Sequence, residues 1–292
     1  MRCFSLLILL VLSLSVGVAY GQTDRWELTA RTNATIMVGE GVRREAKGEL
    51  DKAIADYTEA IRIDPTYDDA WFSRGGARHK KGDNDGAIAD YTKTIELNPR
   101  FEGAHFARGL ARFVKEDNDG AIADCARAIE LNPANADAYY LRGNARNIKA
   151  DTDGAIADFT KTIELNPRYD GVYFDRGNAR FAKGEWDGAI ADYTKVIELK
   201  PQDVNAYANR GYARGEKGDT DGAIADATKA IELKPQSANL YGLRGLIKLK
   251  QGKDAEAQQD FDTALKIDPS SKADLEEAIK KAKQARKATP KP

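Results

Sequence analysis

Cysteine and histidine are scarce in this sequence, with two residues of each among 292. Two cysteines cannot build the several disulfides of a stapled scaffold, and two histidines argue against a histidine-based metal centre. Neither sign of charge is in excess, because 45 basic and 46 acidic residues leave a formal net charge of -1. That balance argues against a nucleic-acid partner held by bulk positive charge. We expect no metal, no cofactor and no nucleic acid.

One long apolar run does occur, at the start of the chain. Arg2 precedes an uncharged segment over residues 4–18, and Ala19-Tyr20-Gly21 follows with small residues at the two positions that a signal peptidase reads. The run is shorter than the roughly 20 residues needed to span a bilayer. Residues 1–21 are therefore predicted to be a cleaved signal peptide, which implies a periplasmic or secreted protein. The alternative is a retained N-terminal membrane anchor.

Most of the prolines occur at one regular spacing. Seven of the nine prolines are spaced 34 residues apart: Pro65, Pro99, Pro133, Pro167, Pro201, Pro235 and Pro269. A fixed period of this length is typical of a repeat solenoid. With proline at position 32, seven repeats fill residues 34–271, as 34–67, 68–101, 102–135, 136–169, 170–203, 204–237 and 238–271. Residues 22–33 form a lead-in.

Other positions follow the same period. Position 8 is Gly and position 20 is Ala in every repeat, while position 24 is aromatic in five repeats and position 4 is aromatic or His in repeats two to seven. Small residues at positions 8 and 20 let two antiparallel helices approach closely, and the large residues fill the space beside them. Proline at position 32 ends the second helix. A single helix pair cannot bury its apolar face, so the repeats are expected to stack.

These positions resemble the tetratricopeptide repeat, as in residues 173–201, YFDRGNARFAKGEWDGAIADYTKVIELKP. The resemblance implies an all-α, right-handed superhelix of helix pairs, with a concave groove lined mainly by first helices. It also implies a protein-interaction scaffold. The sequence holds no recognisable constellation of catalytic residues, so we expect no enzyme. Two departures stand out: arginine replaces the usual aliphatic residue at position 7 in repeats two to seven, and the usual Tyr at position 11 in repeats two to six.

Residues 272–288 are predicted to be an amphipathic helix, with Leu275, Ile279 and Ala282 on one stripe and basic residues around it. It resembles the helix that covers the last repeat in such proteins. Residues 289–292 form a short tail.

The arginines at position 7 and the aspartates at position 23 form two ladders. The arginines are Arg74, Arg108, Arg142, Arg176, Arg210 and Arg244, and the aspartates of repeats two to six are Asp90, Asp124, Asp158, Asp192 and Asp226. We expect the two ladders to pair, because the planar arginine fork matches a carboxylate. The alternative is an anion-binding track.

The resemblance assigns positions 2, 5, 9, 12 and 13 to the groove. The candidate ligand residues at these positions are Phe72, Phe106, Phe113, Tyr140, Asn144, Phe174, Asn178, Phe181 and Tyr212. Rigid aromatic rings with interspersed amides suit an extended or helical peptide. The alternative is that the aromatic residues only pack between neighbouring helices.

The resulting hypothesis is an exported adaptor that binds a protein or peptide in its groove. Two alternatives stay open: a polysaccharide-binding protein or a self-assembling structural protein, each within an envelope export or assembly system. Self-association is compatible with all three. The sequon at Asn33 matters only in a host that glycosylates. The remaining cysteine of the mature chain, Cys125, is expected to be a small buried residue.

Overall fold

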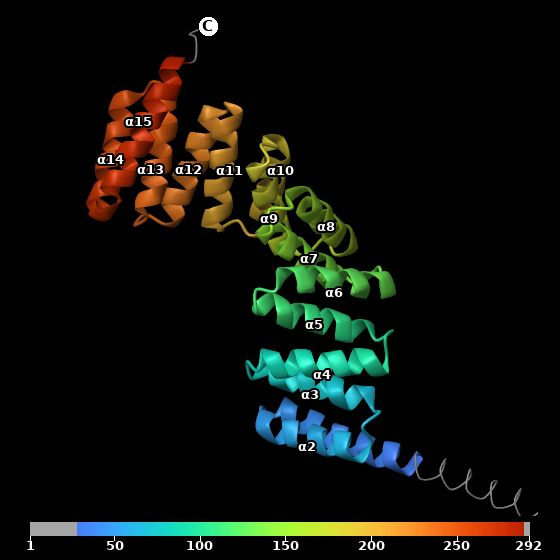
Figure 1. The fold of residues 1–292 in the computed structure, drawn as a ribbon. Coiled ribbons are helices and arrows are strands. Elements are labelled where there is room, and N and C mark those ends of the chain that lie inside the picture. The colour runs from blue at the N-terminus through green and yellow to red at the C-terminus, as the bar shows by residue number, and fades with distance from the viewer. Residues whose placement is uncertain (1–27, 289–292) are drawn as a thin grey trace, which may run out of the picture. The chain divides into compact units, whose positions relative to one another are not determined.

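The structure, a computed structural model, describes residues 28–288. The predicted signal peptide and residues 289–292 lie outside this range. The described residues contain α-helices and one 3-10 turn and no strand (Figure 1). They divide into two compact units, and the division falls inside one helix, between Leu141 and Arg142.

The N-terminal unit begins with a helix over residues 28–46. It continues with α2 (Leu50–Ile63), α3 (Asp68–Lys80), α4 (Asn84–Leu97), α5 (Glu102–Val114), α6 (Asn118–Leu131) and the first part of α7 (Ala136–Ile148). The C-terminal unit holds the rest of α7, then α8 (Thr152–Leu165), α9 (Asp170–Ala182), α10 (Trp186–Leu199), α11 (Val204–Lys217), α12 (Thr220–Leu233), α13 (Ala238–Lys250) and α14 (Asp254–Ile267). The 3-10 turn Pro269–Ser271 and α15 (Lys272–Ala288) complete it.

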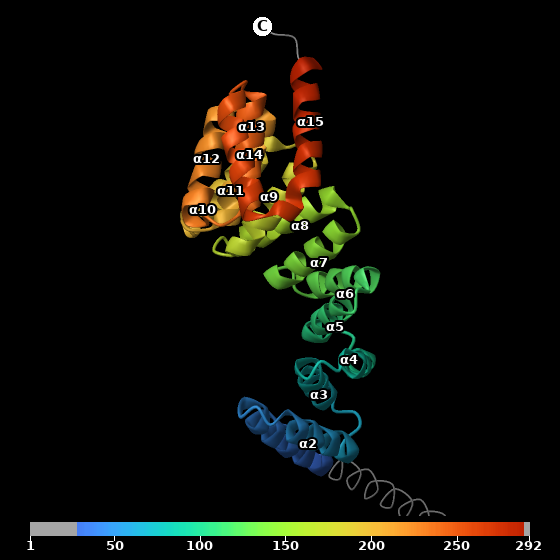
Figure 2. The same cartoon turned by 90° about the vertical axis from the view of Figure 1, so that its left-hand side faces the viewer.

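In each unit, the two helices of a repeat pack together and the second helix packs on the first helix of the next repeat. The pairs α5 with α6 and α11 with α12 show this packing in both views (Figures 1 and 2). The result is the all-α helix-turn-helix stack that the 34-residue period predicts.

Small residues set the distance between the paired helices. The alanine at position 20 is fully buried in all seven repeats. A Cβ added at Gly177 would lie 2.8 Å from Cε1 of Tyr193, and one at Gly75 would lie 2.7 Å from the same atom of Tyr91. The aromatic ring at position 24 therefore fills the space that glycine at position 8 leaves free.

The turn between the two helices has a left-handed residue at position 15. Glycine takes this conformation in five repeats, for example Gly218 with φ of 95°. In repeats three and four the residue is Glu116, with φ of 63°, and Ala150, with φ of 61°. A residue with a side chain is strained in this left-handed backbone conformation, so the turns at Glu116 and Ala150 lower the stability of their repeats.

Aspartate at position 16 caps the second helix, as expected for an acidic residue there. The carboxylate of Asp83 accepts a hydrogen bond from the Gly86 amide at 2.9 Å, and Asp219 accepts one from the Gly222 amide at 3.0 Å. The same bond occurs at Asp117 and Asp151.

Helix α15 takes a different place from the other first helices. They pack on the second helix before them, but α15 packs mainly along α13. Leu275, Ile279 and Ala282 pack with Leu246 and Leu249, which occupy positions 9 and 12. The helix therefore covers positions 9 and 12 of repeat seven.

Candidate functional site

The Arg and Asp ladders pair inside each repeat. In repeats two to seven, the position 7 arginine donates from Nε to one oxygen of the position 23 aspartate at 2.9 to 3.0 Å. Its Nη2 donates to the other oxygen at 2.6 to 2.7 Å. These are two-pronged, charge-assisted bonds between the paired helices.

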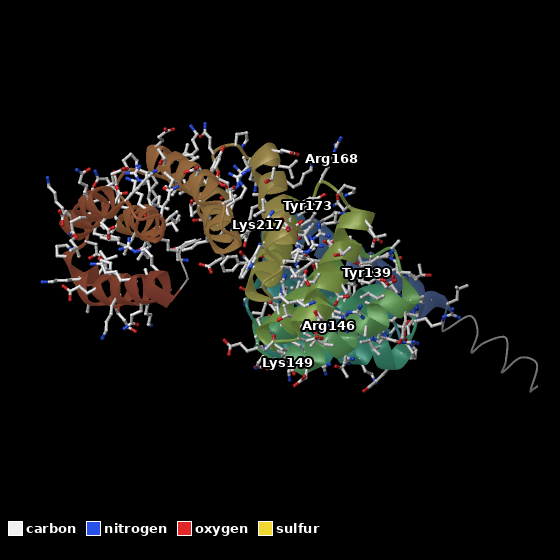
Figure 3. The ribbon with its side chains drawn as sticks, turned by 90° about the horizontal axis from the view of Figure 1, so that it is seen from above. Tyr139, Arg146, Lys149, Arg168, Tyr173 and Lys217 are labelled. Atoms are coloured by element: carbon white, nitrogen blue, oxygen red, sulfur yellow. The ribbon has the colours of Figure 1, made fainter. Side chains whose placement is uncertain are left out.

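A second arginine donates a further hydrogen bond to most of these aspartates. In repeats two to six, Nη1 of the position 11 arginine donates to the same carboxylate at 2.7 to 2.8 Å. Figure 3 labels one of these residues, Arg146, whose partner is Asp158. Repeat seven uses Lys248 instead, with Nζ 2.9 Å from Asp260.

The position 7 arginine also reaches the previous repeat. Nη1 of Arg176 donates to the hydroxyl of Thr160 at 3.0 Å, and Arg74 makes the equivalent bond to Thr58 at 3.2 Å. The Arg74 guanidinium lies 4.8 Å from the ring centroid of Trp71. Because the fork is occupied by Asp, Thr and an aromatic face, these contacts favour a structural role over an anion-binding track.

Repeat one departs from this pattern. Glu40 stands where the other repeats have the first arginine, and Asp56 keeps one ion pair, to Nε of Arg44 at 3.0 Å. The irregular first repeat thus has a weaker link between its two helices.

The residues at position 4 serve a related structural purpose. The Trp71 indole donates to the Pro65 carbonyl at 3.0 Å, and the Tyr173 hydroxyl donates to the Pro167 carbonyl at 3.2 Å. In His105, Nε2 lies 3.1 Å from the Pro99 carbonyl, and the ring is buried. Each side chain fastens a first helix to the end of the preceding second helix.

The predicted groove aromatics are half-buried and contact other rings. Phe72 lies 5.6 Å from Tyr91 and 4.8 Å from Phe101 between ring centroids, and Phe174 lies 5.8 Å from Tyr193. Phe106 packs beside the cluster of Ala128, Ile129 and Ala138. These rings have packing partners and also keep an accessible edge, so both interpretations from the sequence apply to them.

The other candidates differ in exposure. Phe113, Tyr140 and Asn144 are half-buried. Phe181 is half-buried and packs edge-on against Trp186, with 5.1 Å between centroids. Tyr212 is the most open, with 43% of its surface exposed. The hollows lined by Phe72 and by Tyr212 do not include Phe106, Phe113, Tyr140, Asn144 or Phe174.

Three predicted residues do meet in one place. Asn178, Phe181 and Tyr212, with Tyr193 and Asn209, line a hollow of about 280 Å³ on the first-helix face of the C-terminal unit. We call it the amide hollow. Its residues come from α9, α10 and α11, so it spans the step from repeat five to repeat six.

Hydrogen bonds fix the two amides. The Tyr193 hydroxyl donates to Oδ1 of Asn178 at 2.9 Å, and Nδ2 of Asn209 donates to the same oxygen at 3.0 Å. Burial raises the pKa of the Tyr193 hydroxyl above its usual range, so it stays protonated and can donate. The Asn178 carbonyl is thus oriented before any ligand arrives.

The sequence-based prediction missed Tyr193 and Asn209 as parts of this site. Tyr193 occupies position 24, which was treated as scaffold, and Asn209 occupies position 6. The signal that could have found them is geometric: positions 9, 12 and 24 of one repeat face positions 6 and 9 of the next.

The same step recurs in the N-terminal unit with different chemistry. Val42, Glu45, Ala46 and Tyr57 of repeat one and Phe72, Ser73, Gly76 and Lys80 of repeat two line a hollow of about 420 Å³. We call it the N-terminal hollow. Glu45 accepts a bond from the Tyr57 hydroxyl at 2.8 Å and one from Lys80 at 2.7 Å. Burial, and then the bond to Glu45, raise the pKa of Tyr57.

A further contact between repeats was also missed. Lysine at position 14 reaches the aspartate at position 18 of the previous repeat, as for Lys183 with Asp153 at 2.7 Å and Lys217 with Asp187 at 2.5 Å. Lys81 with Asp51 and Lys115 with Asp85 make the same pair. Lys217 is labelled in Figure 3. Exposed pairs of this kind contribute little individually.

Residues 28–288 contain neither a metal-binding cluster nor a membrane-spanning helix. No group of three or more His, Cys, Asp or Glu side chains there could hold a metal ion. No helix in that range is both long enough and apolar enough to cross a bilayer.

Family comparisons agree with the repeat architecture. A family model described as TPR repeat matches residues 45–82, 75–115, 109–146 and 177–218. Two further models, both described as tetratricopeptide repeat, match residues 136–169 and 208–272. No curated protein matches the sequence.

Solved structures share the fold. A crystal structure of MamA protein is 30% identical and covers 59% of this chain and 94% of its own, with a TM-score of 0.56. YrrB, described as a TPR protein with an unusual peptide-binding site, is 23% identical and covers 61% of this chain and 92% of its own, with a TM-score of 0.58. A tetratricopeptide repeat protein from Parabacteroides merdae is 22% identical and covers 86% of this chain and 99% of its own, with a TM-score of 0.58.

The repeat family and its fold indicate a scaffold for protein–protein interaction. The family matches run from residue 45 to residue 272 with one short gap. The chain belongs to the tetratricopeptide repeat family.

Proposed function

We propose that the chain is an exported adaptor that binds an extended segment of a partner protein at the amide hollow. The observation that carries the proposal is the oriented pair of Asn178 and Asn209 beside the rings of Phe181 and Tyr212. Amides can donate to and accept from a peptide backbone, while rigid rings supply contact area at low entropic cost. YrrB is described as having a peptide-binding site, which is consistent with this use of the fold.

Export is part of the proposal and rests on residues 1–21 alone. The charged start, the apolar run and the small residues before Gln22 fit a cleaved signal. N-terminal sequencing of the protein purified from its host should give Gln22 as the first residue. A chain that still begins at Met1 in the membrane fraction would replace this part of the proposal with a retained anchor.

Crosslinking in the native host tests the binding site. A photoreactive amino acid placed at position 212, on the rim of the hollow, should capture a reproducible protein partner in the otherwise unchanged chain. The Asn178→Ala, Phe181→Ala double variant should keep its helix content and lose that partner. The matched control is Lys195→Ala, Glu198→Ala, which removes an exposed ion pair from α10 in the same repeat.

The other outcomes separate the alternatives. Capture of this chain alone would indicate self-association, and binding of the purified protein to a glycan array without any captured protein would indicate polysaccharide binding. Equal capture by the double variant and its control would remove the amide hollow from consideration.

A further inference from the structure

A second hollow lies next to the amide hollow in the C-terminal unit. It has a volume of about 340 Å³ and spans the step from repeat six to repeat seven, between α11, α13 and α15. Its walls include Gly215, Leu243, Leu246, Ile247, Ala278 and Ala282. We call it the apolar slot. Tyr212 lines both hollows, so the two are neighbours on one face.

The sequence explains why a slot exists at this step. The residue at position 24 is an aromatic ring in five repeats, and the ring of Tyr193 lines the amide hollow. Repeat six has Ala227 there instead. Ile247 stands at a position that is alanine in repeats two to six, and with Leu243 it packs in one cluster with Ala227. These two side chains form an aliphatic floor, and glycine at position 12, Gly215, adds no side chain above it.

Helix α15 supplies the third wall. Its residues Ala278 and Ala282 line the slot, while Leu275, Ile279 and Ala282 pack with Leu246 and Leu249. Arg286 fixes the far end of the helix, because its Nη1 donates to the Leu249 carbonyl at 2.8 Å and to Asp254 at 2.9 Å. The wall is therefore held in place by contacts outside the slot.

Charges lie at the rim of the slot and already have partners. Lys250 donates to Glu216 at 2.8 Å, and Lys281 lies 2.6 Å from Glu277. An occupant thus meets an apolar interior with satisfied charges around it, which does not suit a charged group. The volume of the slot, about 340 Å³, is at the lower end of the range for small-ligand pockets, so the slot has room for one bulky side chain.

We propose that the apolar slot binds an aromatic side chain of the same peptide segment that occupies the amide hollow. This inference rests on the proposed function and specifies the ligand. The aliphatic walls and the volume of the slot suit one bulky apolar side chain. Tyr212, with its exposed ring, offers an edge or face to that ring. The partner segment has a hydrogen-bonding stretch followed by, or preceded by, Phe, Tyr or Trp.

The slot can be tested without knowing the partner. The probe is N-acetyl-L-phenylalaninamide, titrated into the full chain while the methyl signals of Leu243, Leu246 and Ile247 are followed by NMR. A ligand of this size is expected to bind with a dissociation constant on the order of 1 mM. N-acetyl-L-alaninamide should leave these signals unchanged.

Filling variants provide the control. Ala278→Phe places a ring in the slot and should weaken probe binding at least tenfold. Ala273→Phe adds the same ring at an exposed site on the same helix and should have no effect. If Ala278→Phe fails to fold, Gly215→Leu serves instead, since a Cβ there would lie at ordinary contact distance, 3.7 Å from Cγ1 of Ile247. Unchanged probe binding by the filled variant, or equal binding of the alanine probe, would overturn the proposal.

A random 12-residue peptide library displayed on phage separates this inference from the proposed function. Selected peptides should be rich in aromatic residues, and should bind neither Ala278→Phe nor Asn178→Ala. Peptides that still bind Ala278→Phe but do not bind Asn178→Ala would contradict the proposal for the slot and leave the proposed function standing. If the probe binds in the slot but the selected peptides still bind Asn178→Ala, the slot stands and the proposed function is wrong. If the wild type dimerises and Ala278→Phe does not, a second copy fills the slot and the peptide proposal is wrong.

Discussion

The N-terminal hollow and the amide hollow use the same repeat positions and carry different chemistry. Position 9 is Val42 in one and Asn178 in the other, and position 12 is Glu45 and Phe181. The floor is a tyrosine at position 24 in both, but its hydroxyl donates to a carboxylate in the first and to an amide in the second. These two hollows thus share the same floor residue and differ at the rim.

The fixed parts follow from packing, and the variable parts are free to serve ligands. The alanine at position 20 and the Arg–Asp pairs recur because every repeat must join the same two helices at the same distance. Residues at positions 9 and 12 make few of those contacts, so they can change from repeat to repeat. Differences between the hollows are therefore the best guide to specificity in this chain.

The largest expected effect breaks the Arg–Asp link, which differs between repeat one and the later repeats. Asp192 accepts three charge-assisted bonds from Arg176 and Arg180, whereas Asp56 has one ion pair, to Arg44. Asp192→Ala removes a buried carboxylate and leaves two half-buried guanidinium groups without it, which should cost about 3–5 kcal/mol of unfolding free energy. Asp56→Ala should cost about 1–2 kcal/mol.

Urea unfolding followed by circular dichroism measures both. Asp187→Ala, which alters an exposed aspartate on the same helix as Asp192, is the control and should change stability little. Equal losses for Asp56→Ala and Asp192→Ala would show that the ladder does not contribute as its bond pattern implies.

The second prediction concerns the tyrosine floor of the hollows. A Cβ at Gly177 would lie 2.8 Å from the Tyr193 ring, while one at Gly211 has the Ala223 carbonyl oxygen at 3.3 Å as its nearest atom. Gly177→Ala should therefore cost about 2 kcal/mol through overpacking. In Gly211→Ala, the better helix propensity of alanine, worth about 1 kcal/mol, should offset most of the loss.

Thermal melts of the two variants provide the measurement, and Gly41→Ala extends it to the N-terminal unit, where Tyr57 forms the floor. A Gly211→Ala variant as unstable as Gly177→Ala would mean that the ring at position 24 does not set the requirement for glycine.

The third prediction uses one strained turn from each unit. Glu116 and Ala150 adopt the left-handed conformation that glycine takes in the other repeats. Glu116→Gly and Ala150→Gly should each raise the unfolding free energy by about 1 kcal/mol, because glycine carries no steric penalty there. The opposite change, Gly218→Ala, should lower it by a similar amount. A loss of stability in Ala150→Gly would indicate that unfolded-state entropy outweighs the strain.

Much of the fold was predictable from the sequence because it depends on contacts inside one repeat. The 34-residue period of Pro, Gly and Ala predicted a stack of helix pairs. The Arg and Asp side chains that pair, such as Arg176 and Asp192, lie on the facing sides of one hairpin. The helix caps are also local, because the Asp83 carboxylate accepts a bond from the Gly86 amide three residues later.

The site was less predictable because it depends on contacts between repeats. The bonds of Asn209 to Asn178 and of Arg176 to Thr160 cross from one repeat to the next, and the spacing of the stack is not encoded in any single repeat. The position of α15 depended on the small and aliphatic residues Gly242, Leu246 and Leu249 of repeat seven. Their meaning becomes visible only when the helix that covers them is placed.

The smallest expected effect compares two lysines at the surface. Lys80 pairs with Glu45, whose side chain is 19% exposed and also bonded to Tyr57, whereas Lys217 pairs with Asp187, whose side chain is 81% exposed. Lys80→Ala should cost about 0.5–1 kcal/mol and Lys217→Ala less than about 0.5 kcal/mol. Raising the salt concentration to about 0.5 M should abolish the effect of Lys217→Ala and keep most of that of Lys80→Ala, since screening acts mainly on exposed charges. Identical salt dependence in urea unfolding would place Lys80 among the ordinary surface pairs, and Glu45 would then no longer count as a fixed feature of the N-terminal hollow.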